Sequence, residues 1–234
     1  MVILDNLRFL LLGPFPNGPI GGLALTIILS LLVGICAFCY GILVAGLALS
    51  TSKVISGTTQ LVTTLIRSLP SLVFLFWLYF LLPALLGVQF TPLQSAVIAL
   101  SIYQGSFIGE DLRSGLNAVA RGQSEAGAAT GLSSMQIFWH IRLPQAVRLT
   151  IPALVNRYIN LFLYTSTASV VGVLEFTGTV TLVNNRLLVH PIQVFGFAAL
   201  VYFLFCLGIA SVGRYLEGRW SWSRKITRSS SSSA

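Results

Sequence analysis

Residues 23–49 read LALTIILSLLVGICAFCYGILVAGLAL and contain no charged side chain. A helix needs about 20 consecutive apolar residues to cross the hydrocarbon core of a bilayer, so this stretch is long enough to span a membrane. The rest of the chain is similar in character, because 55% of its 234 residues are hydrophobic and only 9% are charged. So few charges cannot cover the surface of a soluble domain. The sequence therefore predicts an all-α membrane protein.

Four more apolar stretches follow, at residues 69–90, 93–109, 158–174 and 191–213, which makes five expected transmembrane helices. Pro83 and Gly87 predict a stop or kink near the end of the second stretch. Pro191 suits the first turn of the last one. Between the first two stretches, residues 51–68 mix apolar and polar side chains, and we expect a helix that continues into the second span with its polar residues covered by neighbouring helices.

The basic residues are distributed unequally between the two sides that five spans create. Of the 14 Lys and Arg residues, only Arg8 and Arg186 fall on one side, and the remainder fall on the other. Because cytoplasmic loops carry the excess of Lys and Arg, we expect an extracytoplasmic N-terminal segment at residues 1–22 and a cytoplasmic C-terminus. The serine-rich residues 221–234 predict a disordered tail. This placement argues for contact with membrane lipid and against a nucleic-acid partner.

Chemistry-bearing residues are sparse. Cys36, Cys39 and Cys206 lie in apolar runs and His140 and His190 stand alone, so we expect no metal site. We find neither a Gly-rich Lys-Ser/Thr phosphate loop nor a hydrolase-like cluster, so we expect a non-enzymatic chain whose ATP and Mg²⁺, if used, are bound by a partner. The N-terminus lacks the basic region and cleavage site of a signal peptide.

Residues 125–144, EAGAATGLSSMQIFWHIRLP, form a polar stretch on the expected cytoplasmic side. Ser124 is a candidate N-cap, and Glu125 complements the positive end of a short helix. Gly131 can adopt the left-handed conformation that ends such a helix. Because so short a helix is unstable alone in water, it must either dock in a partner's groove or pack on the chain's own spans.

This stretch resembles the EAA loop in the permease subunits of bacterial ABC importers, whose pattern is Glu-Ala-Ala, three residues, Gly, nine residues, then Ile-x-Leu-Pro. Gly127 replaces the second alanine. The resemblance implies a type I importer permease domain over residues 23–220, with an EAA loop at 121–148 whose short helix sits in a cleft of an ATPase subunit. The implied coupling residues are Glu125, Ala126, Gly127, Ala128, Gly131, Leu132, Ile141, Leu143 and Pro144.

Other landmarks are similar to those of the polar-amino-acid subfamily, including 109–115 (GEDLRSG), 121–123 (RGQ), 172–175 (GVLE) and 214–219 (RYLEGR). The resemblance implies import of a polar amino acid through a bacterial inner membrane. It also implies two cytoplasmic ATPases, a second permease subunit, identical or different, and an extracytoplasmic solute-binding protein. Three positions depart from the subfamily: RSLP at 67–70 replaces Arg-Gly-Thr-Pro, Leu163 replaces a lysine, and Ala120 replaces a proline.

Hydroxyl side chains gather in the fourth expected span and, with two other polar residues, are candidates for the substrate path: Thr165, Ser166, Thr167, Ser169, Arg67 and Gln104. The alternative is that the hydroxyls only hold helices together and that Arg67 extends toward the interface. We expect Glu110 to pair with Arg113 or another basic residue as a structural contact. Glu175 and Arg186 bracket an outer loop that receives either the solute-binding protein or only solvent.

Two other function classes remain open, an ion-coupled secondary carrier and a purely structural membrane scaffold. Within the importer interpretation, the chain could also serve another small polar solute. A secondary carrier would be favoured by an internal repeat or by deeply placed ionisable residues, and we find neither in the sequence. A purely structural membrane scaffold would explain the apolar stretches and leave residues 125–144 unexplained.

Overall fold

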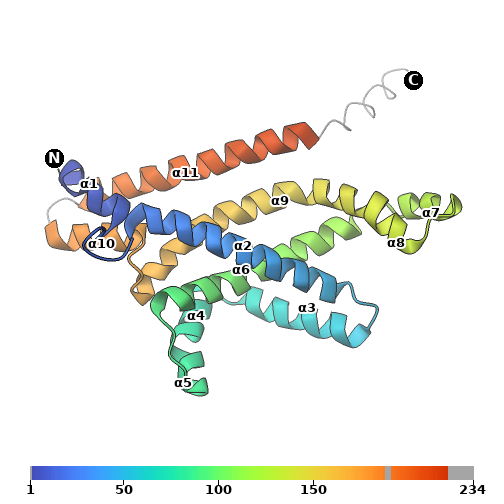
Figure 1. Ribbon diagram of the computed structural model, residues 1–234, viewed down its shortest axis with the longest axis horizontal. Helices are drawn as coiled ribbons and strands as arrows, with labels where there is room; N and C mark the ends of the chain where they lie inside the picture. The colour runs from blue at the N-terminus through green and yellow to red at the C-terminus, as the bar shows by residue number, and fades with distance from the viewer. Residues whose placement is uncertain (1, 188–190, 221–234) are drawn as a thin grey trace.

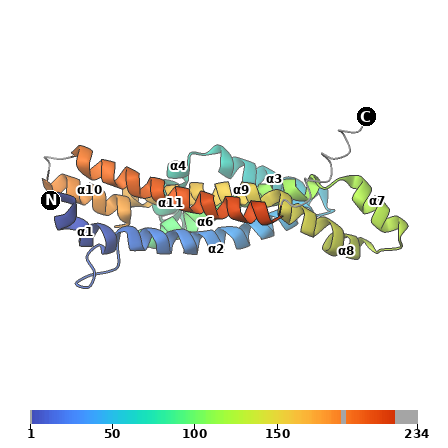
Figure 2. The same cartoon turned by 90° about the horizontal axis from the view of Figure 1, so that it is seen from above.

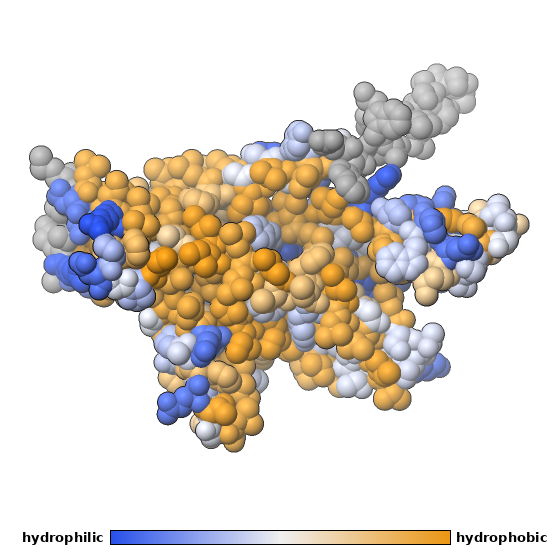
Figure 3. Space-filling model, viewed as in Figure 1, coloured by the Kyte–Doolittle hydropathy of each residue, from blue (hydrophilic) through white to orange (hydrophobic). Residues whose placement is uncertain are grey.

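The computed structural model describes residues 2–187 and 191–220. Regular structure in this part of the chain is entirely helical, which confirms the expected all-α class. The expected disordered tail and His190 lie outside the described residues. Figure 3 shows apolar residues covering the middle of the body and hydrophilic residues gathered toward its two ends, as a membrane protein requires.

Four long helices build the body: α2 (Gly22–Ala48), α6 (Pro92–Asn117), α9 (Leu143–Tyr164) and α11 (Pro191–Trp220). They lie along the long axis of the molecule, with α9 running opposite to the other three (Figure 1). At one end, α1 (Val2–Leu12) and α10 (Phe176–Leu187) pack beside the start of α11. At the other end, α7 (Arg121–Ala129) and α8 (Ser134–Ile137) extend beyond the body, as the second view also shows (Figure 2).

Small residues allow α2 and α6 to approach closely. A side chain at Gly105 would lie 2.7 Å from the carbonyl oxygen of Ala37, and one at Gly109 would lie 2.5 Å from Val44 Cγ1. A side chain at Gly41 would lie 2.6 Å from Ile108 Cγ2. This is the small-xxx-small arrangement by which membrane helices gain van der Waals contact without help from the hydrophobic effect. The core then fills with aliphatic side chains from α2, α6 and α9, including Leu29, Val33, Leu100 and Leu161.

The expected continuous helix through residues 51–90 is wrong. α3 (Lys53–Ser68) ends at Ser68, and the next helical segment leaves at an angle of 105°. That segment consists of α4 (Ser71–Phe76), η1 (Trp77–Leu81) and α5 (Leu82–Leu86), and it projects from the body as an arm (Figure 1). The cause is Pro70, which lacks an N–H group and disfavours helical geometry at Leu69, whose ψ is 145°.

One side of α3 gathers polar residues that the rest of the chain partly covers, as expected. Thr63 is buried, and Ser56, Thr59, Gln60 and Arg67, which lie on the same side of the helix, are half-buried. The opposite side carries exposed apolar residues, including Val54, Leu61 and Leu65.

Two described helices, α2 and residues Pro191–Gly218 of α11, are long and apolar enough to cross a membrane, and the bent pair Lys53–Ser68 with Ser71–Leu86 is a third candidate. The expected third span lies within the longer α6. The expected fourth span is divided between α9 and the 3₁₀ helix η3 (Thr165–Val171), which ends at Gly172 with φ +94°.

Glu175 does not lie in a solvated outer loop, as one interpretation of the sequence held. Its side chain is fully buried at the start of α10. One carboxylate oxygen accepts from the Gly178 N–H at 3.0 Å, and the other accepts from the Thr26 hydroxyl at 3.0 Å and the Tyr202 hydroxyl at 3.3 Å. Glu175 thus joins α2, α10 and α11, because a buried carboxylate must be satisfied by hydrogen bonds.

Candidate functional site

The EAA loop, residues 121–148, projects beyond the ends of α6 and α9. Its first helix, α7, begins at Arg121 with Ala120 in the cap position, so the expectation that Ser124 caps it is wrong. Gly127 is the one buried residue within α7. Glu125, Ala126 and Ala128 are exposed, so the outer face of this helix offers a nearly flat backbone surface to anything that approaches.

Gly131 ends α7 in the left-handed conformation, with φ +83°. The Leu132 N–H donates to the Gly127 carbonyl at 3.2 Å, and the Gly131 N–H donates to the Ala128 carbonyl at 3.0 Å. These two bonds form a Schellman motif, which satisfies the last carbonyls of a helix and favours glycine at the left-handed position. The turn directs the chain back toward the body.

Gly127 occupies the position where the EAA pattern has alanine. A side chain there would lie 2.8 Å from Ile141 Cδ1 and 3.1 Å from Ile137 Cγ1. The two isoleucines therefore pack directly on the backbone of α7. This contact explains how a helix so poor in side chains holds its place on the loop.

The loop is tied to the body at several points. Arg142 donates to the Leu116 carbonyl at 3.2 Å, near the C-terminal end of α6, where a cation is favourable. Phe138 packs against the small cluster of Leu116, Val119 and Ala146. At the turn before α8, Ser133 and Gln136 form a reciprocal capping box. These contacts hold the EAA loop in place against the end of α6.

A single helical rod leads from this loop into the body. α8, the π-helical segment η2 (Phe138–Arg142) and α9 follow one another without a break from Ser134 to Tyr164. Leu143 and Pro144 open α9, and because Pro144 has no N–H the preceding turn widens into η2. The rod runs on directly into η3.

A polar hollow of about 550 Å³ lies between the end of α6, α7 and η2. Glu125, Arg121 and Arg142 contribute to its lining. Among the described residues, Glu125 has no basic group within ion-pair distance. This exposed carboxylate is therefore free to meet a partner at the tip of the molecule.

Two exposed apolar side chains beside α7 escaped the sequence reasoning. Met135 is 66% exposed and Trp139 is 56% exposed, and the Trp139 N–H points to the Met135 sulfur at 3.1 Å. They occur four residues apart on one side of a helix, a spacing that could have shown them as a pair. Large apolar residues at the tip of a hydrophilic loop are typical of a contact surface.

The hydroxyl band of η3 bonds mainly to its own backbone. Thr165, Ser166, Thr167 and Ser169 each donate to the carbonyl three residues earlier, all at 2.7 Å. Thr165 is completely buried. These bonds are compatible with the structural interpretation of the hydroxyls, and their role in a substrate path stays a prediction.

Gln104 lies apart from that band, in α6. It is 1% exposed, and its Nε2 has no hydrogen-bond partner, like the buried Ser101 hydroxyl one turn earlier. Buried polar atoms without partners are rare, so this pair marks a polar spot inside the apolar core.

Charged residues of α3, α6 and α9 meet where α3 ends at Ser68. Glu110 Oε1 lies 2.6 Å from Arg113 Nη2, and Glu110 Oε2 lies 3.7 Å from Arg67 Nη2.

A second ion pair stands beside this one. Arg157 of α9 and Asp111 of α6 are 2.7 Å apart. Both Arg67 and Arg157 also face the ring of Phe107, at 5.8 and 4.5 Å from its centroid. Arg67 is therefore held on α6 by charge and by an aromatic ring, and the three helices are joined in one charged layer.

Comparison with known proteins identifies relatives of this architecture. Residues 37–222 match the family model described as "Binding-protein-dependent transport system inner membrane component". The chain is 32% identical to the probable glutamine ABC transporter permease protein GlnM of Bacillus subtilis (strain 168), covering 83% of this chain and 89% of that one. It is also 32% identical to the L-cystine transport system permease protein TcyB of the same organism, with 85% of each covered.

Solved structures with a similar fold were also found. One entitled "Crystal structure of an amino acid ABC transporter with histidines" superposes with a TM-score of 0.80 at 25% identity, covering 85% of this chain and 92% of that one. A MetNI methionine ABC transporter structure shares the fold, with a TM-score of 0.65 at 20% identity, covering 81% of this chain and 92% of that one. On the family match and these relatives, the chain belongs to the binding-protein-dependent transport system inner membrane components.

Proposed function

We propose that this chain is the membrane-spanning permease subunit of an ATP-driven importer that carries a polar amino acid across a bacterial inner membrane. Two cytoplasmic ATPases bind ATP and Mg²⁺, a second permease subunit completes the pathway, and an extracytoplasmic binding protein delivers the solute. Glutamine and cystine stand in the names of the relatives at 32% identity, which supports an amino acid as the cargo.

The observation that carries this proposal is the packing of α7 against a helix that runs without a break from α8 to η3. A short, flat helix with exposed Glu125 is braced on the loop, and the loop continues as one rod into the core. When the ATPases close on ATP, α7 moves with them, and the rod transmits the displacement. The exposed Met135 and Trp139 add apolar contact area to this docking surface.

The second permease subunit is supported by two exposed apolar surfaces. One is the outer side of α3, where Val54 and Leu61 are exposed. The other is the arm α4–η1–α5, where Trp77, Phe80 and Leu85 are exposed. A second subunit, identical or different, would cover both.

We further propose that five helical passes cross the membrane with the N-terminus outside. The passes would be α2, the bent α3–α5, α6, α9 with η3, and α11. In this arrangement α7, α8 and the C-terminal end of α11 lie in the cytoplasm, and α1 with α10 lies outside. The unequal distribution of Lys and Arg and the placement of these elements at opposite ends support it (Figure 1).

Reconstituted vesicles test the proposed function. The permease, its ATPases and its binding protein are placed in liposomes, and uptake of labelled glutamine, cystine, glutamate and histidine is measured with ATP enclosed. ATP-dependent uptake of at least one amino acid is expected. Uptake of a different polar solute alone would replace the cargo, and uptake driven by an ion gradient without ATP would support the secondary carrier instead.

A further inference from the structure

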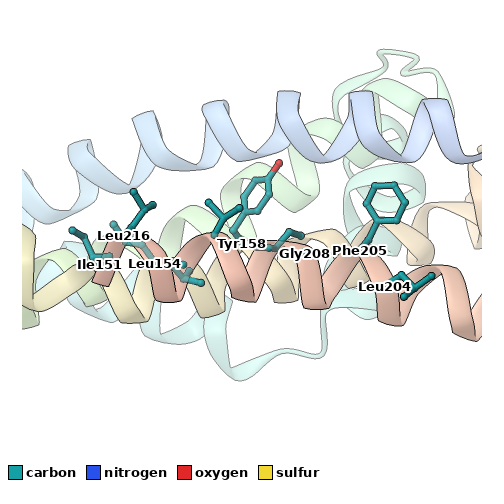
Figure 4. Close-up of a pocket in the computed structure, with 11 residues that line it drawn as sticks. Ile151, Leu154, Tyr158, Leu204, Phe205, Gly208 and Leu216 are labelled. Carbon is teal, nitrogen blue, oxygen red and sulfur yellow. The ribbon is translucent and has the colours of Figure 1, made fainter. Parts of the chain in front are cut away.

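Helix α11 changes its surroundings near Leu204. From Leu204 to Leu216 its side chains line an apolar groove of about 800 Å³ beside α9 (Figure 4). Two residues before Leu204, the Tyr202 hydroxyl donates instead to a carboxylate oxygen of Glu175 at 3.3 Å. The proposed transport cycle uses no part of this carboxylate, although it lies where α2, α10 and α11 meet.

Glu175 is buried without a cation beside it. Its side chain is 0% exposed, and the groups that donate to its two oxygens are neutral, namely the Gly178 N–H and the hydroxyls of Thr26 and Tyr202. The ion pairs within residues 2–187 and 191–220 do not include it. A carboxylate taken out of water without an opposite charge is unfavourable, and such a group favours its protonated form.

Few ionisable side chains lie on the parts of α1, α10 and α11 that pack around Glu175: Asp5, Arg8, Arg186, Tyr202 and Cys206. Asp5 is exposed. Arg8 donates to the Phe15 carbonyl at 3.5 Å, and Arg186, at the far end of α10, lies over the ring of Phe9 at 5.2 Å from its centroid. Neither α2 nor η3 contains a charged residue. Glu175 therefore meets hydroxyl groups where a counter-ion could stand.

Burial and hydrogen bonding act on Glu175 in opposite directions. The residue lies beyond the proposed pass of α9 with η3, at the start of α10. Burial raises the pKa of its carboxyl group above the usual value of a glutamate, and the hydrogen bonds from α10 and from the two hydroxyls offset only part of this effect. The folded chain therefore binds a proton at Glu175 more readily than the unfolded chain does.

The hydrogen bonds around Glu175 can be completed in both protonation states. In the ionised state Tyr202 donates to Glu175 Oε2, and the Thr177 hydroxyl, 2.8 Å from the Tyr202 oxygen, donates to Tyr202. In the neutral state Glu175 donates to Tyr202, and Tyr202 donates to Thr177. The Thr26 hydroxyl can then turn to the Gly22 carbonyl at 3.3 Å. Binding of a proton thus leaves no buried group without a partner.

The same two hydroxyls form a path toward the surface. Thr177 is half-buried, and Thr181, one turn further along α10, is exposed. A proton that reaches Thr177 from water displaces the Thr177 hydrogen to Tyr202 and the Tyr202 hydrogen to Glu175. Each hydroxyl receives one hydrogen and passes one on, so both end neutral and the carboxylate becomes a carboxyl group.

We propose that Glu175 is a proton-binding site reached from the outer end of the molecule through Thr177 and Tyr202, and that its protonation stabilises the junction of α2, α10 and α11. The source of the proton rests on the proposed orientation, in which α10 lies outside the membrane. The pH of the extracytoplasmic medium then sets the strength of this junction.

Stability should therefore fall as pH rises. Because the pKa of Glu175 is higher in the folded state, the stabilisation is complete below the unfolded-state value and is lost as pH rises through the folded-state value. A glutamate held in its ionised form by its hydrogen bonds would show the opposite trend.

The first test follows the assembled transporter in detergent, with a fluorescent protein fused to the C-terminus of the permease. The temperature at which the tagged chain leaves its monodisperse peak should fall by at least about 2–4 °C between about pH 5 and pH 8. Glu175→Gln keeps the shape of the neutral carboxyl group and should remove this shift. Glu217→Gln makes the same chemical change at a partly exposed position of α11 and should keep it.

The parent chain alone can overturn the proposal, by a midpoint that stays constant or rises with pH. An equal fall in Glu175→Gln would also overturn it. Failure of Glu175→Gln to assemble at about pH 5 counts against it as well, because the amide stands in for the carboxyl group that is expected to be stable there.

Infrared difference spectra of the same complex between the two pH values give a direct readout. A protonated carboxyl group has a C=O stretch that an ionised carboxylate lacks. One such band, gained at the lower pH by the parent chain and by Glu217→Gln, should be missing in Glu175→Gln, and identical spectra for all three would refute the site. Neither readout depends on cargo or orientation, so ATP-dependent uptake, measured separately, distinguishes failure of this inference from failure of the proposed function.

Discussion

Gly131 illustrates how much one backbone conformation contributes to this site. Its φ of +83° permits the Schellman motif that closes α7, and no other atom crowds the position. Glycine is therefore required at position 131 for its backbone conformation and not because space is short. Gly127 shows the opposite case, because its φ is unremarkable and the adjoining isoleucines leave little room for a side chain.

Gly131→Ala is expected to weaken the end of α7 and the transport that depends on it. A non-glycine residue in the left-handed region costs about 1–2 kcal/mol. Gly122→Ala is the matched control, because Gly122 lies inside α7 with open space around it, and alanine there should favour the helix by up to about 1 kcal/mol. Uptake per ATP hydrolysed should fall for Gly131→Ala only. Equal ratios in both variants would show that the turn has no part in coupling.

Glu175 should matter more to stability than any other carboxylate discussed above. Glu175→Ala leaves the buried Gly178 N–H without its acceptor, whereas the Thr26 hydroxyl keeps the Gly22 carbonyl and the Tyr202 hydroxyl keeps the Thr177 hydroxyl. A buried donor left unpaired costs about 1–3 kcal/mol, so a loss of this size is expected. Glu217→Ala, on a partly exposed position of α11, is the control. Similar melting temperatures for the two variants would show that the Glu175 network contributes little.

At the scale of elements, the contact of α2 with α6 organises the body. Gly109→Leu would force a side chain against Val44 and the Gly41 carbonyl, and overpacking of this kind costs about 1–3 kcal/mol or more. Gly46→Leu, at a position of α2 with no atom near it, is the matched control. The first variant should lose its monodisperse profile in detergent at a lower temperature than the second. Indistinguishable profiles would mean that the close approach is dispensable.

Much of the element pattern could be predicted from the sequence, because long uncharged runs and Pro191 are local signals. The turn at Gly131 was predictable for the same reason. The sharp break at Pro70 was not, since a proline in a membrane helix is compatible with a mild kink and only tertiary packing sets the angle. The burial of Glu175 was missed because its partners, Thr26 and Tyr202, are distant in sequence. Met135 and Trp139 were not predicted as a contact surface, because two apolar residues four apart on a helix are equally typical of a buried face.

At the scale of the whole molecule, the chain has two hydrophilic ends joined by an apolar body (Figure 3). The EAA loop forms one end and is braced to α6 and α9, whereas α1 and α10 form the other. A rigid rod between a docking loop and the core can convert movement of a partner into movement of helices. This arrangement is the physical basis of the proposed coupling.

Crosslinking between Ala128 and the ATPase tests this central claim most directly. Cys36, Cys39 and Cys206 are first replaced by serine, and one cysteine is introduced at Ala128, which is exposed on α7, or at Asp5, which is exposed on α1. Both variants are expressed with the ATPase subunit and treated with a short reagent that carries one thiol-reactive group and one photoreactive group. The account predicts that Ala128→Cys crosslinks to the ATPase and Asp5→Cys does not. Absence of a crosslink from Ala128→Cys in an assembled complex, or a crosslink from Asp5→Cys, would contradict it.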